Sequence, residues 1–166
     1  MRSWLACLDG QFLSLGPSIW EIQSLMWELT NTYGETRYAK PSGRCSDGFI
    51  IPDLINKALG LPFSRPFLGL KVEDQVFPSI NFASDGSGLL NSTHSDWGVV
   101  PFSEQLKQIR EFSMKISKKN LIVVISSGGN DIAANLQNIM DVDLEGMLMS
   151  LEKRLQQLYE YGVLGR

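Results

Sequence analysis

LIVVISSGGND, residues 121–131, is the stretch that decides the fold. Its first part is five consecutive aliphatic residues without alternation, which is typical of a strand buried on both faces of a parallel sheet. Its second part contains Gly128 and Gly129, and glycines let a backbone adopt positive φ and approach a ligand closely. Ligand sites in open α/β sheets lie beyond the carboxyl ends of the strands. We therefore expect a buried strand that ends in a functional loop.

Two amphipathic helices are predicted on the N-terminal side of this strand. One runs from Pro101 to about Ser117, because its apolar residues recur at spacings of three and four: Phe102, Leu106, Ile109, Phe112 and Ile116. The other is IIPDLINKALGLP, residues 50–62, with Pro52 in its first turn and a stop at Gly60 and Pro62. One face of it is apolar and carries Ile50, Ile51, Leu54, Ile55, Ala58 and Leu59.

A third helix is predicted from about Asp143 to Tyr161, with Gly162 as its cap. Its leucine stripe is interpreted as a face packed on a core rather than a partner-binding zipper. A shorter apolar segment, residues 78–83, is predicted to be another strand before the glycine-rich SDGSG. Helices alternating with buried strands predict an α/β fold with a mainly parallel sheet. We expect an incomplete three-layer α/β/α arrangement, since the sequence stops at a point where a further strand would begin.

Composition restricts the classes of function. The chain has 166 residues, enough for one domain, and a formal net charge of −3 that argues against nucleic-acid binding. No apolar run approaches the ~20 residues of a membrane span. Asp9 interrupts the apolar start MRSWLACL, so we do not interpret it as a signal peptide, and the compartment stays open. One histidine and two distant cysteines, Cys7 and Cys45, make no zinc set. We predict no metal and no cofactor.

Two loops carry candidate chemistry. In residues 126–131 the amide of Asn130 could donate to a developing negative charge; the alternative is a strand-to-helix turn capped by Asn130 or Asp131. In residues 84–88 Gly86 and Gly88 could cradle a phosphate. That alternative is weak, because the third glycine of the dinucleotide fingerprint and a GxxxxGK[ST] motif are both missing.

Four fragments, in order, resemble the plant GDSL esterase/lipase family, a branch of the SGNH hydrolases. The resemblance covers residues 33–166 and rests on YGETRYAKPSGRCSDGFIIPDLINKALGLP, INFASDGSGLLN, VPFSEQLKQIREF and VVISSGGND. We therefore divide the chain into a divergent segment, residues 1–32, and a partial hydrolase domain, residues 33–166. The resemblance implies a three-layer α/β/α fold and hydrolysis of a small-molecule or lipid ester. Such proteins are typically secreted.

The resemblance also implies a site. Its oxyanion hole would take the backbone of Gly86 and the side chain of Asn130, in a pocket shaped by Gly128 and Gly129. Asp85 departs from the family, where glycine is usual, and a carboxylate beside an oxyanion hole would oppose the charge being stabilised.

The catalytic residues depart further from the family. No GDS occurs in the sequence, and the place where it is expected reads Ala6-Cys7-Leu8-Asp9-Gly10. Ser14 is interpreted as a turn or surface serine, and Cys7 as a buried cysteine rather than a nucleophile. The single histidine, His94, follows Asn91 by three residues, so no DxxH exists, and we expect it to face solvent.

These departures predict a chain without serine-dependent esterase activity, and they leave no catalytic residue identifiable. The alternatives are a non-catalytic binding or regulatory remnant, or a gene-model fragment. Neither the substrate ester nor the oligomeric state follows from the sequence.

Overall fold

A computed structural model describes residues 4–8, 48–70, 78–114, 121–135 and 141–164. Its sheet has four strands: β1 (Trp4–Leu8), β2 (Arg65–Pro66), β3 (Ser79–Asn81) and β4 (Leu121–Ile125). Every pair of neighbours is parallel, in the order β2-β3-β1-β4. The predicted parallel sheet is therefore confirmed, and β1 lies inside it. The predicted domain boundary at residue 32 falls outside the described residues and stays a prediction.

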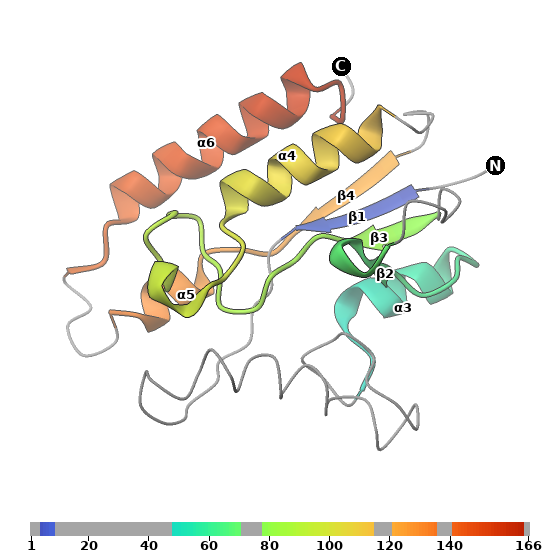
Figure 1. Ribbon diagram of the computed structural model, residues 1–166, viewed down its shortest axis with the longest axis horizontal. Coiled ribbons are helices and arrows are strands. Elements are labelled where there is room, and N and C mark those ends of the chain that lie inside the picture. The colour runs from blue at the N-terminus through green and yellow to red at the C-terminus, as the bar shows by residue number, and fades with distance from the viewer. Residues whose placement is uncertain (1–3, 9–47, 71–77, 115–120, 136–140, 165–166) are drawn as a thin grey trace.

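Helices lie on both sides of this sheet (Figure 1). On one side are α4 (Phe102–Ser113) and α6 (Leu144–Glu160), and on the other is α3 (Ile51–Ala58). A short helix, α5 (Gly129–Ala133), follows β4. The described residues also contain two 3₁₀ turns, η1 (Phe67–Gly69) and η2 (Ser95–Trp97). This arrangement agrees with the three-layer α/β/α class. None of the described helices is long and apolar enough to cross a membrane.

The core lies between the sheet and α4. The periodic residues predicted for α4 are buried as expected, since Phe102, Leu106 and Ile109 are almost inaccessible. Phe112 packs edge-on against Phe82, which follows β3, with the ring centres 5.9 Å apart. The last predicted member of this stripe, Ile116, lies outside the described residues. Burial of this single periodic face holds α4 on the sheet.

The termini of α6 confirm the predicted third helix. Asp143 is the N-cap, and its carboxylate accepts a hydrogen bond from the Gly146 backbone N–H at 2.8 Å. At the other end Gly162 has φ 64°, and the Val163 N–H donates to the Leu158 carbonyl at 2.9 Å. Val163 is buried, so the turn after the helix is anchored in the core.

Burial in α3 does not follow its apolar face. The apolar face predicted for α3 is largely exposed, with Ile51 at 67% and Leu54 at 52%, whereas Asp53 and Asn56 are buried. The reason is a polar cluster under the helix: the Asn56 amide donates to Ser64 Oγ at 2.9 Å and to Ser79 Oγ at 2.8 Å.

β4, predicted to be buried on both faces, is the last strand of the described sheet. Ile122 in this strand is 39% exposed, and the other residues of β4 are half-buried. Burial on both faces requires neighbours that the described residues do not supply on this side.

The leucine stripe predicted to pack on the core is divided in α6. Met147 and Leu158 are buried, but Leu144, Leu148 and Leu155 are exposed at 60%, 67% and 39%. The interpretation as a core-facing stripe is therefore confirmed for Met147, Leu151 and Leu158 and wrong for Leu144, Leu148 and Leu155.

Candidate functional site

Two loops leave the sheet side by side at its carboxyl edge. Cys7 of β1 is in register with Asn81 of β3 on one side and with Val124 of β4 on the other. The chain beyond β3 and the chain beyond β4 therefore emerge at the same level. They touch directly, because the Asn130 side-chain amide donates a hydrogen bond to the Ser87 carbonyl at 2.8 Å. The structure thus brings Asn130 next to residues 84–88, the glycine block, which contains Gly86.

The loop after β4 is built around a glycine that no other residue replaces without strain. Gly128 is the N-cap of α5 and has φ 104°. It is also packed tightly, since a Cβ there would lie 3.3 Å from Met147 Cε and 3.4 Å from Leu89 Cδ1. Nearby, the Ser127 hydroxyl oxygen is buried and has no hydrogen-bond partner in the described part of the chain. A bound water or ligand group would satisfy it.

Capping of α5 by Asn130 or Asp131 is wrong. The N-cap of α5 is Gly128, and the buried side chains of Asn130 and Asp131 reach across to the other loop instead.

The Asp131 carboxylate fastens the two loops together. It accepts the Leu89 N–H at 2.8 Å, the Leu90 N–H at 2.9 Å and the Thr93 hydroxyl at 2.6 Å. Three donors around one buried carboxylate fix the loop after β3 against α5. We did not predict this role, and the sequence offers only the adjacency of Asn130 and Asp131 as a signal.

Gly86 occupies a conformation that favours glycine. Its φ is 81°, it is buried, and a Cβ would lie 3.1 Å from Val99 Cγ1. In the turns and loops of the described residues, the Gly86 N–H donates to no backbone carbonyl. This N–H belongs to the pair of donors that the resemblance assigns to the oxyanion hole.

His94 does not face solvent as predicted. It is half-buried, its ring stacks on Trp97 with centres 3.7 Å apart, and its Nδ1 lies 2.8 Å from the Gly86 carbonyl oxygen. Because a carbonyl only accepts, Nδ1 is the donor and carries the proton. The ring therefore supports the Gly86 peptide from one side. His94 itself has φ 47°, a left-handed conformation.

A second support, also missed from the sequence, comes from α4. The Gln105 side chain is fully buried and its amide donates to Ser87 Oγ at 3.0 Å and to the Val100 carbonyl at 2.9 Å. Ser87 Oγ in turn donates to the Ser84 carbonyl at 2.8 Å. The glycine block is thus held from α4, from His94 and from Asp131.

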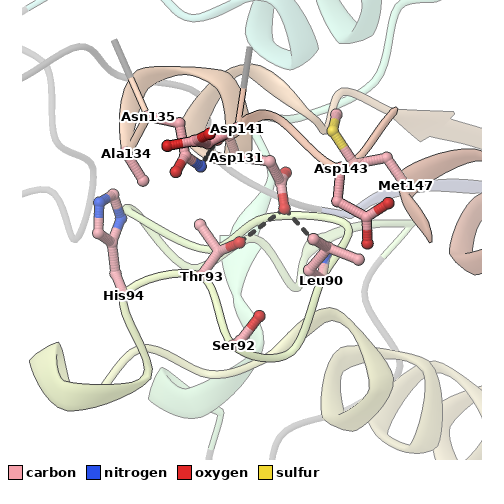
Figure 2. Close-up of a pocket in the computed structure, with 10 residues that line it drawn as sticks. All are labelled: Leu90, Ser92, Thr93, His94, Asp131, Ala134, Asn135, Asp141, Asp143 and Met147. Carbon is pink, nitrogen blue, oxygen red and sulfur yellow. Dashed lines mark hydrogen bonds between the residues drawn. The ribbon is translucent and has the colours of Figure 1, made fainter. Parts of the chain in front are cut away.

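A pocket of about 330 Å³ lies beside these loops (Figure 2). It is bordered by the turn that contains Ser92 and His94, by α5 and by the start of α6. Asp131 faces it, hydrogen-bonded to Thr93 and Leu90. The complete lining is Leu90, Ser92, Thr93, His94, Asp131, Ala134, Asn135, Asp141, Asp143 and Met147.

This geometry disfavours the phosphate-cradle alternative. The backbone N–H groups of Leu89 and Leu90, which directly follow the predicted cradle of residues 84–88, are bound by the Asp131 carboxylate. A negative charge in that position would repel an anion. In the described ranges, no three histidine, cysteine, aspartate or glutamate side chains come together as a metal ligand set.

The predicted nucleophile region cannot be placed completely. β1 ends at Leu8, in register with Ile125, so the carboxyl end of this strand lies at the same edge of the sheet as the two loops. Asp9, Gly10, Ser14 and Cys45 lie outside the described residues. The predicted burial of Cys7 stays a prediction.

The fold and the site define a class of protein. It is a three-layer α/β protein with a parallel sheet and two paired loops at the carboxyl edge of that sheet. Residues 15–164 match the family described as GDSL-like Lipase/Acylhydrolase, and the chain belongs to this family.

Similar proteins carry the same family name. The chain is 32% identical over 148 residues to GDSL esterase/lipase 6 of Arabidopsis thaliana, covering 78% of this chain and 40% of that protein. It is 30% identical over 109 residues to the Arabidopsis GDSL esterase/lipase LTL1, covering 58% and 30% respectively. The chain therefore spans less than half the length of these relatives. No solved structure matches.

Proposed function

We propose that this chain is a GDSL-family domain that supplies the oxyanion-binding side of a carboxylic-ester site. The carrying observation is the hydrogen bond from the Asn130 amide to the Ser87 carbonyl, which sets the Asn130 side chain beside Gly86. Family membership supports ester hydrolysis as the activity of the whole protein, with a small-molecule or lipid ester as substrate.

The chemistry of the two donors supports this assignment. In acyl transfer the carbonyl oxygen of the ester becomes negatively charged as the tetrahedral intermediate forms. Backbone N–H groups and a side-chain amide stabilise that charge most effectively when they are already fixed in place. The buried contacts of Asp131 and Gln105 would hold Asn130 and Gly86 in this way.

Turnover requires more than these donors. A nucleophile and a base are needed, and the sequence contains neither GDS nor DxxH. Loss of triad members leaves only a small part of the acceleration, roughly 10³–10⁴ over water from the oxyanion hole and binding. We therefore propose that the 166-residue chain by itself has no serine-dependent esterase activity.

Two measurements test this proposal. Pure protein is assayed with a short-chain p-nitrophenyl ester, and we expect no turnover above the buffer blank. Ester turnover that is abolished by Asn130→Ala but unchanged by Ser14→Ala would contradict the proposal that the chain is inactive.

The donors are tested separately by titrating short-chain carboxylate, an ester-hydrolysis product, while recording backbone and side-chain amide NMR signals. We expect shifts at Gly86 and the Asn130 amide. These should persist in Asn135→Ala, which removes an amide side chain just after the end of α5, and disappear in Asn130→Ala. A titration that moves neither signal would contradict the oxyanion assignment.

A non-catalytic binding role is the second candidate. The observation that favours it is the exposed apolar surface of α6, where Leu148 is 67% exposed. A gene-model fragment would expose such surface without function and would aggregate. Cooperative thermal unfolding of a monodisperse protein would count against the fragment, whereas poor solubility would support it.

A further inference from the structure

Helix α6 carries a second apolar stripe, of which the core covers only Leu151 in part. Leu144, Leu148 and Leu155 are exposed at 60%, 67% and 39%, and Leu151 between them is half-buried. The spacings of four, three and four residues are those of alternating d and a positions in a heptad. Such a seam is where a second helix packs.

The outer flank of this stripe is acidic. Glu145 follows Leu144, and Glu152 follows Leu151, so the two carboxylates occupy equivalent positions one heptad apart. Both are exposed. Together with three leucines of the stripe they line a shallow groove of about 850 Å³ along α6. The described residues that line it are Glu145, Leu148, Met149, Leu151, Glu152, Lys153, Leu155 and Gln156.

We infer that this groove is a docking surface for an amphipathic helix of another protein, with an apolar stripe and a flank of lysine or arginine. Helix-in-groove recognition buries leucines at a and d positions, and charges beside the seam select the partner. When a partner helix covers the groove, the carboxylates of Glu145 and Glu152 lose contact with water. A flank of lysine or arginine on the partner is needed because it supplies the opposite charges that compensate for this loss. The inference does not depend on the proposed ester chemistry.

A second copy of this chain does not meet the requirement. In an antiparallel pair of α6 helices the flank with Glu145 and Glu152 would face the same flank of the other copy, and the carboxylates would repel. In a parallel pair it would face the positions of Met147 and Arg154, which are buried in the core. Lys153 lines the groove directly after Glu152, and its single positive charge leaves the two carboxylates in excess. The surface is therefore suited to a different, basic helix.

The test uses the full 166-residue chain and two labelled three-heptad peptides with leucine at a and d. One peptide has lysine at e and g, and the other has glutamate. Fluorescence anisotropy should show binding of the lysine peptide and affinity at least about tenfold weaker for the glutamate peptide. Leu148→Glu should weaken binding of the lysine peptide by a similar factor. Glu145→Lys/Glu152→Lys should reverse the preference between peptides.

A matched control separates docking from general attraction to an acidic protein. Asp96→Lys/Glu111→Lys makes the same change of net charge at exposed positions away from the groove and should leave the preference intact. An equal loss in both double variants would overturn the inference, as would unchanged binding by Leu148→Glu. Sedimentation that shows a dimer disrupted by Leu148→Glu would also overturn it, because the stripe would then be occupied by a second copy.

Discussion

Thr93 and Asp131 are 38 residues apart in the sequence, yet the Thr93 hydroxyl donates a 2.6 Å hydrogen bond to the Asp131 carboxylate. Thr93 lies in the turn after the glycine block, and Asp131 lies in α5 beside Asn130. The bond therefore couples the two loops that the ester proposal needs in one place. Groups that stabilise a developing charge are effective only when their positions are set in advance, and Asp131 fixes both at once.

Replacement of Asp131 by asparagine should destabilise the chain strongly. An amide retains one acceptor oxygen but presents an NH₂ group to backbone donors, so at least one of Leu89 N–H and Leu90 N–H would lose its partner in a buried position. We expect a loss of about 2–4 kcal/mol in the free energy of unfolding, measured by urea denaturation. Asp96→Asn, at an exposed position, should change it by less than about 0.5 kcal/mol. Equal effects of both changes would show that Asp131 does not fasten the loops.

Gly88 should tolerate no side chain while Asp131 is present. A Cβ at Gly88 would overlap the Asp131 carboxylate, which its three donors hold in place. We expect Gly88→Ala to cost about 2–3 kcal/mol by the same unfolding measurement. Gly60→Ala is the comparison, since its Cβ meets open space and only its φ of 67° is unfavourable, at about 1 kcal/mol.

A double-mutant cycle tests the cause. In an Asp131→Ala background Gly88→Ala should become cheaper, because the colliding carboxylate is gone. If Gly88→Ala lowers the free energy of unfolding equally with and without Asp131→Ala, the Asp131 carboxylate is not the group with which the new Cβ collides.

Local periodicity predicted the elements well because it depends only on which side of a helix or strand is apolar. Phe102, Leu106 and Ile109 are buried in α4 as their spacing indicates. In α3, by contrast, the apolar side is exposed and Asn56 is buried. Burial there is decided by Ser64 and Ser79, which come from other segments, and periodicity contains no information about them.

The candidate site, like the burial of the helices, could be predicted from the sequence only in part. Two loops after two parallel strands had to meet at one edge, so the proximity of Asn130 to the glycine block follows from topology. The bonds that organise the loops join residues far apart in sequence, such as Asp131 with Thr93 and Gln105 with Ser87. A polar residue in a loop has many local partners, so its long-range one does not follow from composition. For that reason His94 was expected in solvent.

His94→Ala should loosen the glycine block. The change removes the Nδ1–H bond to the Gly86 carbonyl and the stacking on Trp97, and it leaves alanine in a left-handed conformation. We expect a loss of about 1–2 kcal/mol and faster amide hydrogen exchange over residues 84–98. His94→Asn tolerates the backbone conformation better but lacks the ring, so its exchange should also be fast while its stability is less reduced. Unchanged exchange in both variants would show that the ring does not support the block.

Arg154 is a buried cation that no carboxylate of the described chain pairs with. It donates to the Gln157 side chain at 3.1 Å and more weakly to Asn91 at 3.4 Å, while its Nε has no partner. Burial lowers the pKa of Arg154 from its ordinary value, which means that the folded chain disfavours the charged form.

Arg154→Met retains most of the apolar length and removes this charge, so we expect stability to stay equal or to rise by up to about 1 kcal/mol. The lowered pKa also fixes the pH dependence. The penalty is fully present at every pH below the folded-state pKa and is relieved only as the pH rises through it. The difference between Arg154→Met and the parent should therefore be constant between about pH 5 and pH 9 in urea denaturation, where both states keep the guanidinium protonated. Arg110→Met, at an exposed arginine, is the control and should show no gain. A loss of stability in Arg154→Met well beyond that of Arg110→Met would mean that the contacts with Gln157 and Asn91 outweigh the cost of burying the charge.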